Sequence, residues 1–233
     1  MPYDIAGKSI ISEQVLEVRY KPAGRFMDIK GELADSLTNF LPHWQIGVDN
    51  IILTDTLGKA KVESAFVGYK NAGYSSINPS TGNFFQDRCI SFWKAFDENG
   101  IFAIPAIQRV GLRSRIFIES KISREEADNL FMDKIYSSNI NQLFTEDKHA
   151  IKFYIELKVG GDKVVMQAYP FGKKNEGKIF SFVSDELFKS GLFIDIDYFI
   201  VSDLNKRDIP DFVRKALSYT TRKATSFFDY LGL

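Results

Sequence analysis

The sequence has only one cysteine and two histidines. A single cysteine excludes an internal disulfide and any zinc site built from several cysteines, which fits a reducing compartment. Cys89 lies in the aromatic-rich residues 83–96, which we predict to form a strand, and a thiol among aromatic side chains is expected to be buried and inert. His43 and His149 are far apart in the chain, so we do not expect a catalytic Cys–His pair.

The chain also lacks a charge excess and a long apolar run. Thirty basic residues balance thirty acidic residues, so no overall charge favours nucleic acid, an anionic membrane or an acidic partner. No apolar run reaches the roughly 18–20 residues that span a bilayer, and the N-terminal MPYDIAGKSIISEQ has no basic segment followed by a long apolar one. We therefore predict a soluble, cytoplasmic protein without a membrane partner.

Common catalytic motifs are missing as well. The sequence contains no H-E-x-x-H, no G-x-S-x-G and no histidines at metal-ligand spacing. Residues 172–178, GKKNEGK, match the phosphate-loop pattern G-x-x-x-x-G-K, but Ile179 follows where Ser or Thr is needed and a strand is predicted next. We interpret this segment as a hairpin loop. We expect no catalytic residues, no metal and no cofactor, and we lean against an enzyme.

Aromatic residues are abundant: 21 Phe, ten Tyr and two Trp among 233 residues. The composition is otherwise globular, with 45% hydrophobic and 26% charged residues. One interpretation is a thick core with aromatic cross-strand pairs, and the other is a hydrophobic ligand cavity or partner interface.

Two segments near the C-terminus have the clearest periodicity. Residues 193–200 alternate between two strand faces, and the apolar face is predicted to meet the core. That face carries Ile194, Ile196, Tyr198 and Ile200, and the other carries Phe193, Asp195, Asp197 and Phe199. A helix is predicted from an N-cap at Asp208 to a stop at Gly232. Its apolar arc comprises Val213, Ala216, Leu217, Thr220, Ala224, Phe227, Phe228 and Leu231.

Weaker patterns divide the rest of the chain. Strands are predicted at 15–20, 50–55, 61–69, 83–96, 101–119 with a bend near Pro105, 151–159, 164–171 and 179–183. Helices are predicted at 26–41, from Ser123 onward and, as a single turn, at 184–189. Ser123 and Glu126 have the spacing of a capping box.

This succession predicts the α+β class: a large, mainly antiparallel sheet with helices on one face, closed by the long C-terminal helix. We predict a single domain over residues 1–233. A degenerate duplication with halves of about 1–120 and 121–233 is the alternative organisation.

Alternation on two strands predicts a charged sheet face. Arg109, Arg113 and Arg115 share a face of one strand, and Asp195 and Asp197 share a face of another. If the two strand faces lie on the same side of the sheet, the arginine guanidinium groups can pair with the carboxylates. Glu17, Arg19 and Glu156 are then further members of this charged face. One interpretation is a solvated face with salt bridges of roughly 0–1 kcal/mol each. The others are an anion or ligand cleft and an aspartate pair that holds a divalent cation.

Basic residues also gather in the terminal helix and in the loop at 172–178. They are Lys206, Arg207, Arg214, Lys215, Arg222 and Lys223 in the first, and Lys173, Lys174 and Lys178 in the second. We interpret both as solvated charged surfaces rather than as a nucleic-acid site.

Three short motifs stand in the order VLEVRY at 15–20, RVGLR at 109–113 and FIDID at 193–197. This layout resembles a sporadically distributed family of uncharacterised bacterial proteins of similar length. The resemblance implies the fold and the order of elements, because the family has no established activity to carry over. In that family an aromatic residue and an asparagine usually continue the arginine strand, whereas Ser114, Arg115 and Ile116 follow here. A patchy distribution is common among mobile or antiviral-defence genes.

The sequence thus supports three functional hypotheses. The first is a non-enzymatic binding or adaptor protein that contacts a protein partner or copies of itself. The second is a small-ligand or anion sensor, for example for a nucleotide, that uses Arg109 and Arg113. The third is a metal-dependent phosphodiester-cleaving enzyme centred on Asp195 and Asp197.

Overall fold

The computed structural model describes residues 10–57, 62–80, 82–119, 123–136, 151–172, 190–202 and 204–232. The elements in order are β1 (Ile10–Tyr20), α1 (Phe26–Ser36), β2 (His43–Ile46), β3 (Asn50–Thr54), β4 (Glu63–Gly68), β5 (Asn71–Ile77), α2 (Phe84–Glu98), β6 (Ile107–Glu119), α3 (Arg124–Ile135), β7 (Phe153–Val159), β8 (Asp162–Gly172), β9 (Ser190–Ile200), η1 (Lys206–Asp208) and α5 (Ile209–Leu231).

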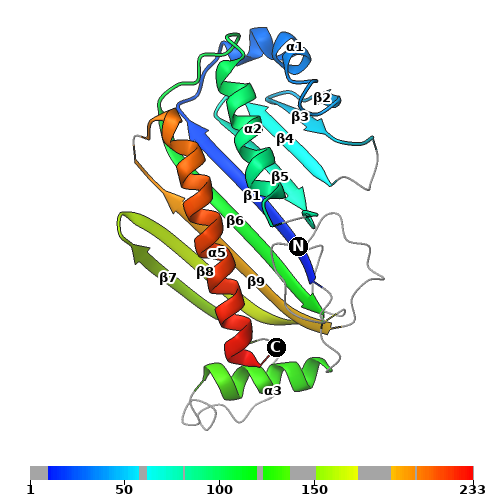
Figure 1. Ribbon diagram of the computed structural model, residues 1–233, viewed down its shortest axis with the longest axis vertical. Coiled ribbons are helices and arrows are strands. Elements are labelled where there is room, and N and C mark those ends of the chain that lie inside the picture. The colour runs from blue at the N-terminus through cyan, green and yellow to red at the C-terminus, as the bar shows by residue number, and fades with distance from the viewer. Residues whose placement is uncertain are drawn as a thin grey trace.

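The nine strands of the described residues form one antiparallel sheet in the order β2-β3-β4-β5-β1-β6-β9-β8-β7. The two long helices, α2 and α5, lie across the same face of this sheet (Figure 1). The predicted α+β class is therefore confirmed, including the closing C-terminal helix.

The order of elements repeats along the chain. A strand, a helix, three antiparallel strands and a second helix occur as β1, α1, β3, β4, β5 and α2, and again as β6, α3, β7, β8, β9 and α5; the first set has the additional strand β2 before β3. The two sets meet where β1 pairs with β6 and Leu16 lies opposite Leu112. The single domain and the duplication both stay predictions; in the order of the described elements, the second set begins with β6 rather than after residue 120.

One core joins both sets of elements. Its largest buried side chains are aromatic, and Phe92, Phe96 and Phe102 stack on one another with ring centroids 6.0 Å apart at each step. On β9 the apolar face points into this core as predicted, with Ile194, Ile196 and Tyr198 fully buried. In α5 the predicted apolar arc is buried except for the half-buried Phe227, and Gly232 ends the helix at a φ of 76°.

The core also contains two similar hydrogen-bonded groups, one in each set of elements. Tyr198 on β9 donates to Asp162 at the start of β8, and Nζ of Lys215 on α5 lies 2.7 Å from the same carboxylate. Tyr74 on β5 donates to Glu63 at the start of β4 over 2.7 Å, and Nε of Arg88 on α2 donates to that carboxylate over 2.6 Å.

The strand pairing makes these two groups equivalent. Tyr74 and Tyr198 each lie opposite the residue two positions after the carboxylate. We name them the tyrosine triads. In each triad a cation on a long helix, Arg88 on α2 or Lys215 on α5, contacts a carboxylate of the sheet.

The prediction of a strand at 83–96 is wrong, because these residues form α2. Phe85, Cys89, Phe92 and Phe96 are buried at steps of four, three and four, which is helical spacing. The run contains enough aromatic residues to resemble a strand locally, and only packing against the sheet decides the case. Cys89 is nevertheless buried, and burial raises the pKa of its thiol, as expected for an inert cysteine.

Other boundaries also differ from the predictions. Strands β2 and β5 were not predicted, the first helix ends at Ser36 rather than at residue 41, and β6 begins at Ile107 rather than at residue 101. The hairpin of β7 and β8 and the capping box of Ser123 and Glu126 are confirmed. The predicted loop after Gly172, the elements at 179–189 and His149 lie outside the described residues. In the described part of the chain, no helix is both long and apolar enough to span a membrane.

Candidate functional site

The predicted charged residues come together on the sheet face opposite the long helices. Arg109, Arg113 and Arg115 lie on β6, next to Asp195 and Asp197 on β9. They point away from α5 because the intervening residues of both strands face the core. We name this surface the charged sheet face, and it comprises Glu13, Glu17, Arg19, Asn71, Arg109, Arg113, Arg115, Gln167, Asp195 and Asp197.

Asp195 is at the centre of this surface. Its side chain is only 4% exposed. Arg113 donates to both carboxylate oxygens, from Nε to Oδ1 over 2.8 Å and from Nη2 to Oδ2 over 2.5 Å. Gln167 on β8 donates to Oδ2 over 2.9 Å. Asp195 is therefore a buried carboxylate that two protein side chains already satisfy.

Arg109 is held from three sides. Its Nη2 donates to Asp197 over 2.8 Å, and its Nη1 lies 3.5 Å from Glu17 on β1. The guanidinium stacks on Phe199, with 4.5 Å between its carbon and the ring centroid. It also lies over Gly111, where an added Cβ would be 2.7 Å from Nη1. The glycine between the arginines thus allows the guanidinium to lie flat against the sheet.

Strand β1 supplies further carboxylates. Glu13 accepts from Nη1 of Arg115 over 2.9 Å. Glu17 accepts from Nε of Arg19 over 2.8 Å and from Nδ2 of Asn71 over 3.0 Å.

The sequence predicted only part of this network. It did not single out Glu13, Asn71 or Gln167, because their participation depends on strand order. Glu156, which was considered a further member, hydrogen-bonds instead to Tyr154 on the same strand.

Burial and neighbouring charges shift the pKa values on this face in opposite directions. Desolvation raises the pKa of Glu13 despite the nearby Arg115, and it raises that of Asp197 despite Arg109 and Arg113. Burial also acts on Glu17, but hydrogen bonds from Arg19 and Asn71 and the charges of Arg19 and Arg109 outweigh it, so the pKa of Glu17 is lowered.

These shifts predict opposite pH responses for two conservative variants. The folded protein binds the Glu13 proton more tightly than the unfolded chain, so this group lowers stability as pH rises from its ordinary pKa of 4.5 through the raised value. Relative to the wild type, Glu13→Gln should gain stability across that window. Glu17 contributes stability above 4.5 that is lost as pH falls through its lowered pKa. Relative to the wild type, Glu17→Gln should therefore lose stability as pH rises. Urea unfolding at several pH values measures both slopes, and slopes of equal sign would contradict this assignment.

The same sheet face has an apolar end. Ile11, Phe117 and Phe193 are buried there and pack with Tyr169 and Phe171. The rings of Phe117 and Phe171 meet edge to face at 5.2 Å, and those of Tyr169 and Phe193 lie 5.0 Å apart. These aromatic pairs link β6, β9 and β8 beyond the last arginine.

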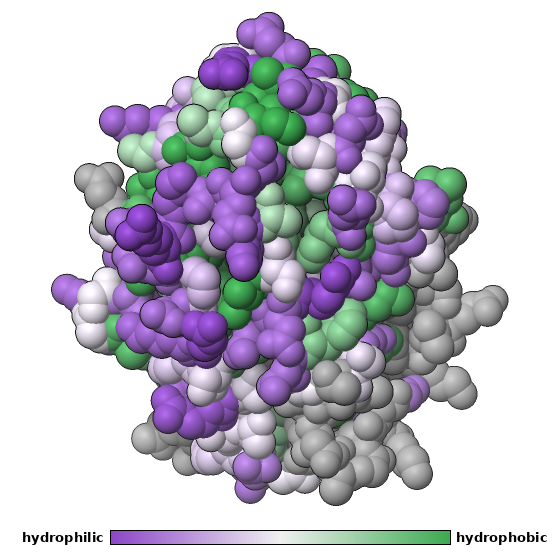
Figure 2. Space-filling view, turned by 45° about the horizontal axis from the view of Figure 1, so that its top comes forward, coloured by the Kyte–Doolittle hydropathy of each residue, from purple (hydrophilic) through white to green (hydrophobic). Residues whose placement is uncertain are grey.

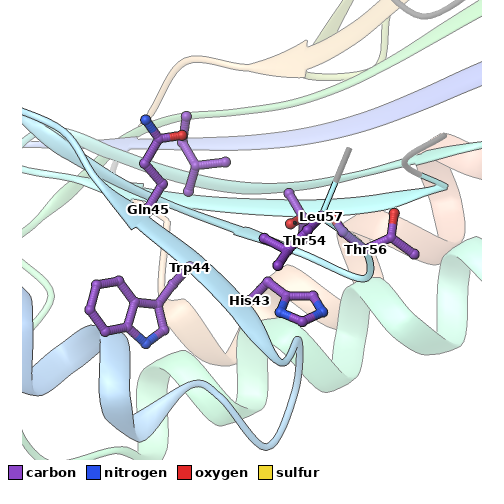
Figure 3. Close-up of a pocket in the computed structure, with 7 residues that line it drawn as sticks. His43, Trp44, Gln45, Thr54, Thr56 and Leu57 are labelled. Atoms are coloured by element: carbon purple, nitrogen blue, oxygen red, sulfur yellow. Dashed lines mark hydrogen bonds between the residues drawn. The ribbon is translucent and has the colours of Figure 1, made fainter. Parts of the chain in front are cut away.

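A separate hollow lies at the edge of the sheet, around β2 and β3. Its lining residues are His43, Trp44, Gln45, Ile52, Thr54, Thr56 and Leu57. In Figure 3, Trp44 and Gln45 extend from opposite sides of β2. Apart from His43, the lining has no titratable side chain, so the hollow is suited to neutral rather than charged groups.

Exposed apolar residues concentrate near this edge. Of nine large exposed apolar side chains among the described residues, six lie between Met27 and Val62. They are Met27, Trp44, Val48, Ile52, Leu57 and Val62. Figure 2, which turns the α1 end of the molecule toward the reader, shows small apolar areas between hydrophilic residues.

The basic residues of the C-terminal region are partly neutralised. Lys206 pairs with Asp97, Arg214 with Asp211, and Lys215 with the Asp162 of its tyrosine triad. Arg222 and Lys223 lie near the ring of Tyr219. Lys173, Lys174 and Lys178 lie outside the described residues.

Within the described ranges, no three His, Cys, Asp or Glu side chains are grouped so that they could hold a metal ion. Comparison with known proteins finds no family model that matches the sequence and no significantly similar curated protein. The resemblance of the three short motifs to a bacterial family stays a prediction.

Proposed function

We propose that the protein is a non-enzymatic binding protein that contacts a protein partner through its charged sheet face. The observation that supports this proposal is the internal pairing of the face. Arg109, Arg113 and Arg115 each bind a carboxylate of the same sheet, and the charges of both signs alternate. Arginine with aromatic neighbours is typical of protein interfaces.

The two alternative functions fit this pairing less well. An anion such as a nucleotide phosphate would have to compete with Asp195 for Arg113 and with Asp197 for Arg109. A divalent cation would have to displace the arginines from the same aspartates. A protein partner can instead use the remaining arginine N–H groups and the exposed side chains around them without breaking the pairs.

Site-specific photo-crosslinking in host cells tests this proposal. The photoreactive residue replaces Lys163 or Tyr154, which are exposed on the same face on β8 and β7, or Ser218, which is exposed on α5. We expect one adduct of defined mass from both sheet positions and none from Ser218.

Two matched charge reversals identify the surface. Arg19 and Arg214 are 55% and 52% exposed, and among the described residues each forms an ion pair with a carboxylate two or three residues away on its own element. Arg19→Glu should lower the adduct yield about tenfold, because like charges across an interface cost at least about 1.4 kcal/mol, whereas Arg214→Glu should not change it. Equal yields in both variants would contradict the proposal. Stabilisation of the purified wild type by nucleotides, with no such adduct, would favour the sensor.

A further inference from the structure

The two outermost strands among the described residues, β2 and β7, differ in charge. Strand β7 carries the charged residues Glu156 and Lys158. Charged side chains on an edge strand are one way in which natural sheets prevent edge pairing. Strand β2 has the sequence HWQI and its neighbour β3 has NIILT, and neither contains Asp, Glu, Lys or Arg. Neither strand therefore has a charged side chain that would prevent a further strand from pairing with β2, and the nearby Lys30 of α1 donates instead to the carbonyls of Gly47 and Val48, beyond the end of β2.

Hydrogen-bond phase determines which β2 groups face outward. The N–H of Gly47 donates to the carbonyl of Asn50 over 2.8 Å, so this is a hydrogen-bonded pair of the antiparallel ladder. Because such pairs alternate, Gln45 with Ile52 and His43 with Thr54 are hydrogen-bonded pairs as well. The backbone N–H and C=O groups of Trp44 and Ile46 then point away from β3, toward the free edge.

We propose that a second copy of this chain pairs with this edge, β2 against β2, about a twofold axis perpendicular to the sheet. In the register centred on Gln45, Trp44 lies opposite Ile46 of the second copy, and the outward groups form four backbone hydrogen bonds. A register centred on Trp44 keeps only two bonds within β2, those between the two Trp44 residues, because Ile46 then lies opposite Pro42, which is outside the strand and has no N–H. The edge is thus complementary to itself in one register.

Side chains in this register are complementary too. Trp44 and Ile46 are on the sheet face that carries the helices, since Trp44 lies opposite the buried Leu53. Trp44 is 43% exposed in the single chain and would pack against Ile46 of the other copy. The two Gln45 side chains meet on the opposite face, where their amides can hydrogen-bond to each other. Because β2 contains no Asp, Glu, Lys or Arg, this pairing places no like charges opposite each other across the axis.

This dimer uses a surface different from the charged sheet face, so the two proposals can fail independently. The dimer extends the sheet continuously across the axis and places both charged sheet faces on the same side. A C2 arrangement of this kind closes on itself and leaves each β7 edge free.

An engineered disulfide tests both the contact and its register. In the proposed dimer, the two residues at position 45 form a non-hydrogen-bonded pair with Cα atoms about 4.5 Å apart, within the range for a disulfide. Gln45→Cys should therefore give a covalent dimer under mild oxidation. His43→Cys should not, because those Cα atoms would be roughly 13 Å apart. The native Cys89 is fully buried and does not interfere.

Sedimentation velocity over a wide concentration range tests the contact without cysteine. Ile46→Pro removes an outward N–H but none of the bonds to β3, and Trp44→Lys adds a charge to the edge. Both should weaken dimerisation at least about tenfold, the equivalent of about 1.4 kcal/mol, while Tyr154→Lys on β7 leaves it unchanged. A wild type that stays monomeric, or a dimer unaffected by Ile46→Pro in a protein with a native circular dichroism spectrum, overturns the proposal. Equal crosslinking of the two cysteine variants overturns the register.

Discussion

Replacing Arg113 by alanine is expected to lower the free energy of unfolding by about 3–5 kcal/mol. The variant leaves the carboxylate of Asp195 almost fully buried, with Gln167 as its remaining hydrogen-bond donor among the contacts described here. An uncompensated buried charge costs far more than the loss of a surface ion pair, which is worth roughly 0–1 kcal/mol. Urea denaturation of the variant and the wild type at neutral pH measures the difference.

The reciprocal variant provides the control. Arg113 is 42% exposed, so after Asp195→Ala its guanidinium can turn to water, and we expect a smaller cost, of about 1–2 kcal/mol. The double variant should be less destabilised than the sum of the two single variants. A cost below about 1 kcal/mol for Arg113→Ala would show instead that the pair behaves as an ordinary solvated salt bridge.

Removing the carboxylate of either tyrosine triad should destabilise the protein by about 1–3 kcal/mol. Tyr74 and Tyr198 are fully buried, and burial is the main cause that raises the pKa of each phenol, to about 12 for Tyr198. After Glu63→Ala or Asp162→Ala, the buried hydroxyl loses its acceptor, and a cation on α2 or α5 loses its partner. Thermal and urea unfolding should show similar losses for the two variants, because the groups occupy equivalent places.

Two comparisons separate this effect from a general loss of charge. Asp211→Ala removes a carboxylate that is 85% exposed and paired with Arg214 one turn away, and it should cost at most about 0.5 kcal/mol. Tyr198→Phe combined with Asp162→Ala should be less destabilised than Asp162→Ala alone, because no buried hydroxyl remains unpaired. If the double variant is the less stable one, the hydroxyl is not the source of the cost.

Local periodicity predicted the elements in which one residue pattern dominates. The alternation of β9 placed Asp195 and Asp197 away from the core, and the spacing of α5 identified its buried arc. Both predictions succeeded because burial on one face leaves a regular signal in a single stretch of chain. The capping box of α3 is local in the same sense.

Predictions failed where neighbours in space decide the structure. Residues 84–98 are rich in aromatic side chains that suit either a strand or a helix, and their packing against β5 and α5 settles the question. Strand β5 reads NAGYSSI, with small and polar residues that indicate no strand by themselves. Its central Tyr74 and Gly73 find partners only once β1 and β4 lie on either side.

The sequence by itself determined which residues share a face, and thus that Arg109, Arg113 and Arg115 lie together and that Asp195 and Asp197 do. Only the tertiary structure decided that these faces adjoin, that Arg113 reaches Asp195 diagonally rather than the Asp197 directly opposite, and that Glu13 and Glu17 complete the network. It likewise decided that the uncharged β2 lies at the edge of the sheet. The reason is physical: the side-chain period is a property of a few successive residues, whereas strand order and register depend on pairing between segments about 80 to 100 residues apart.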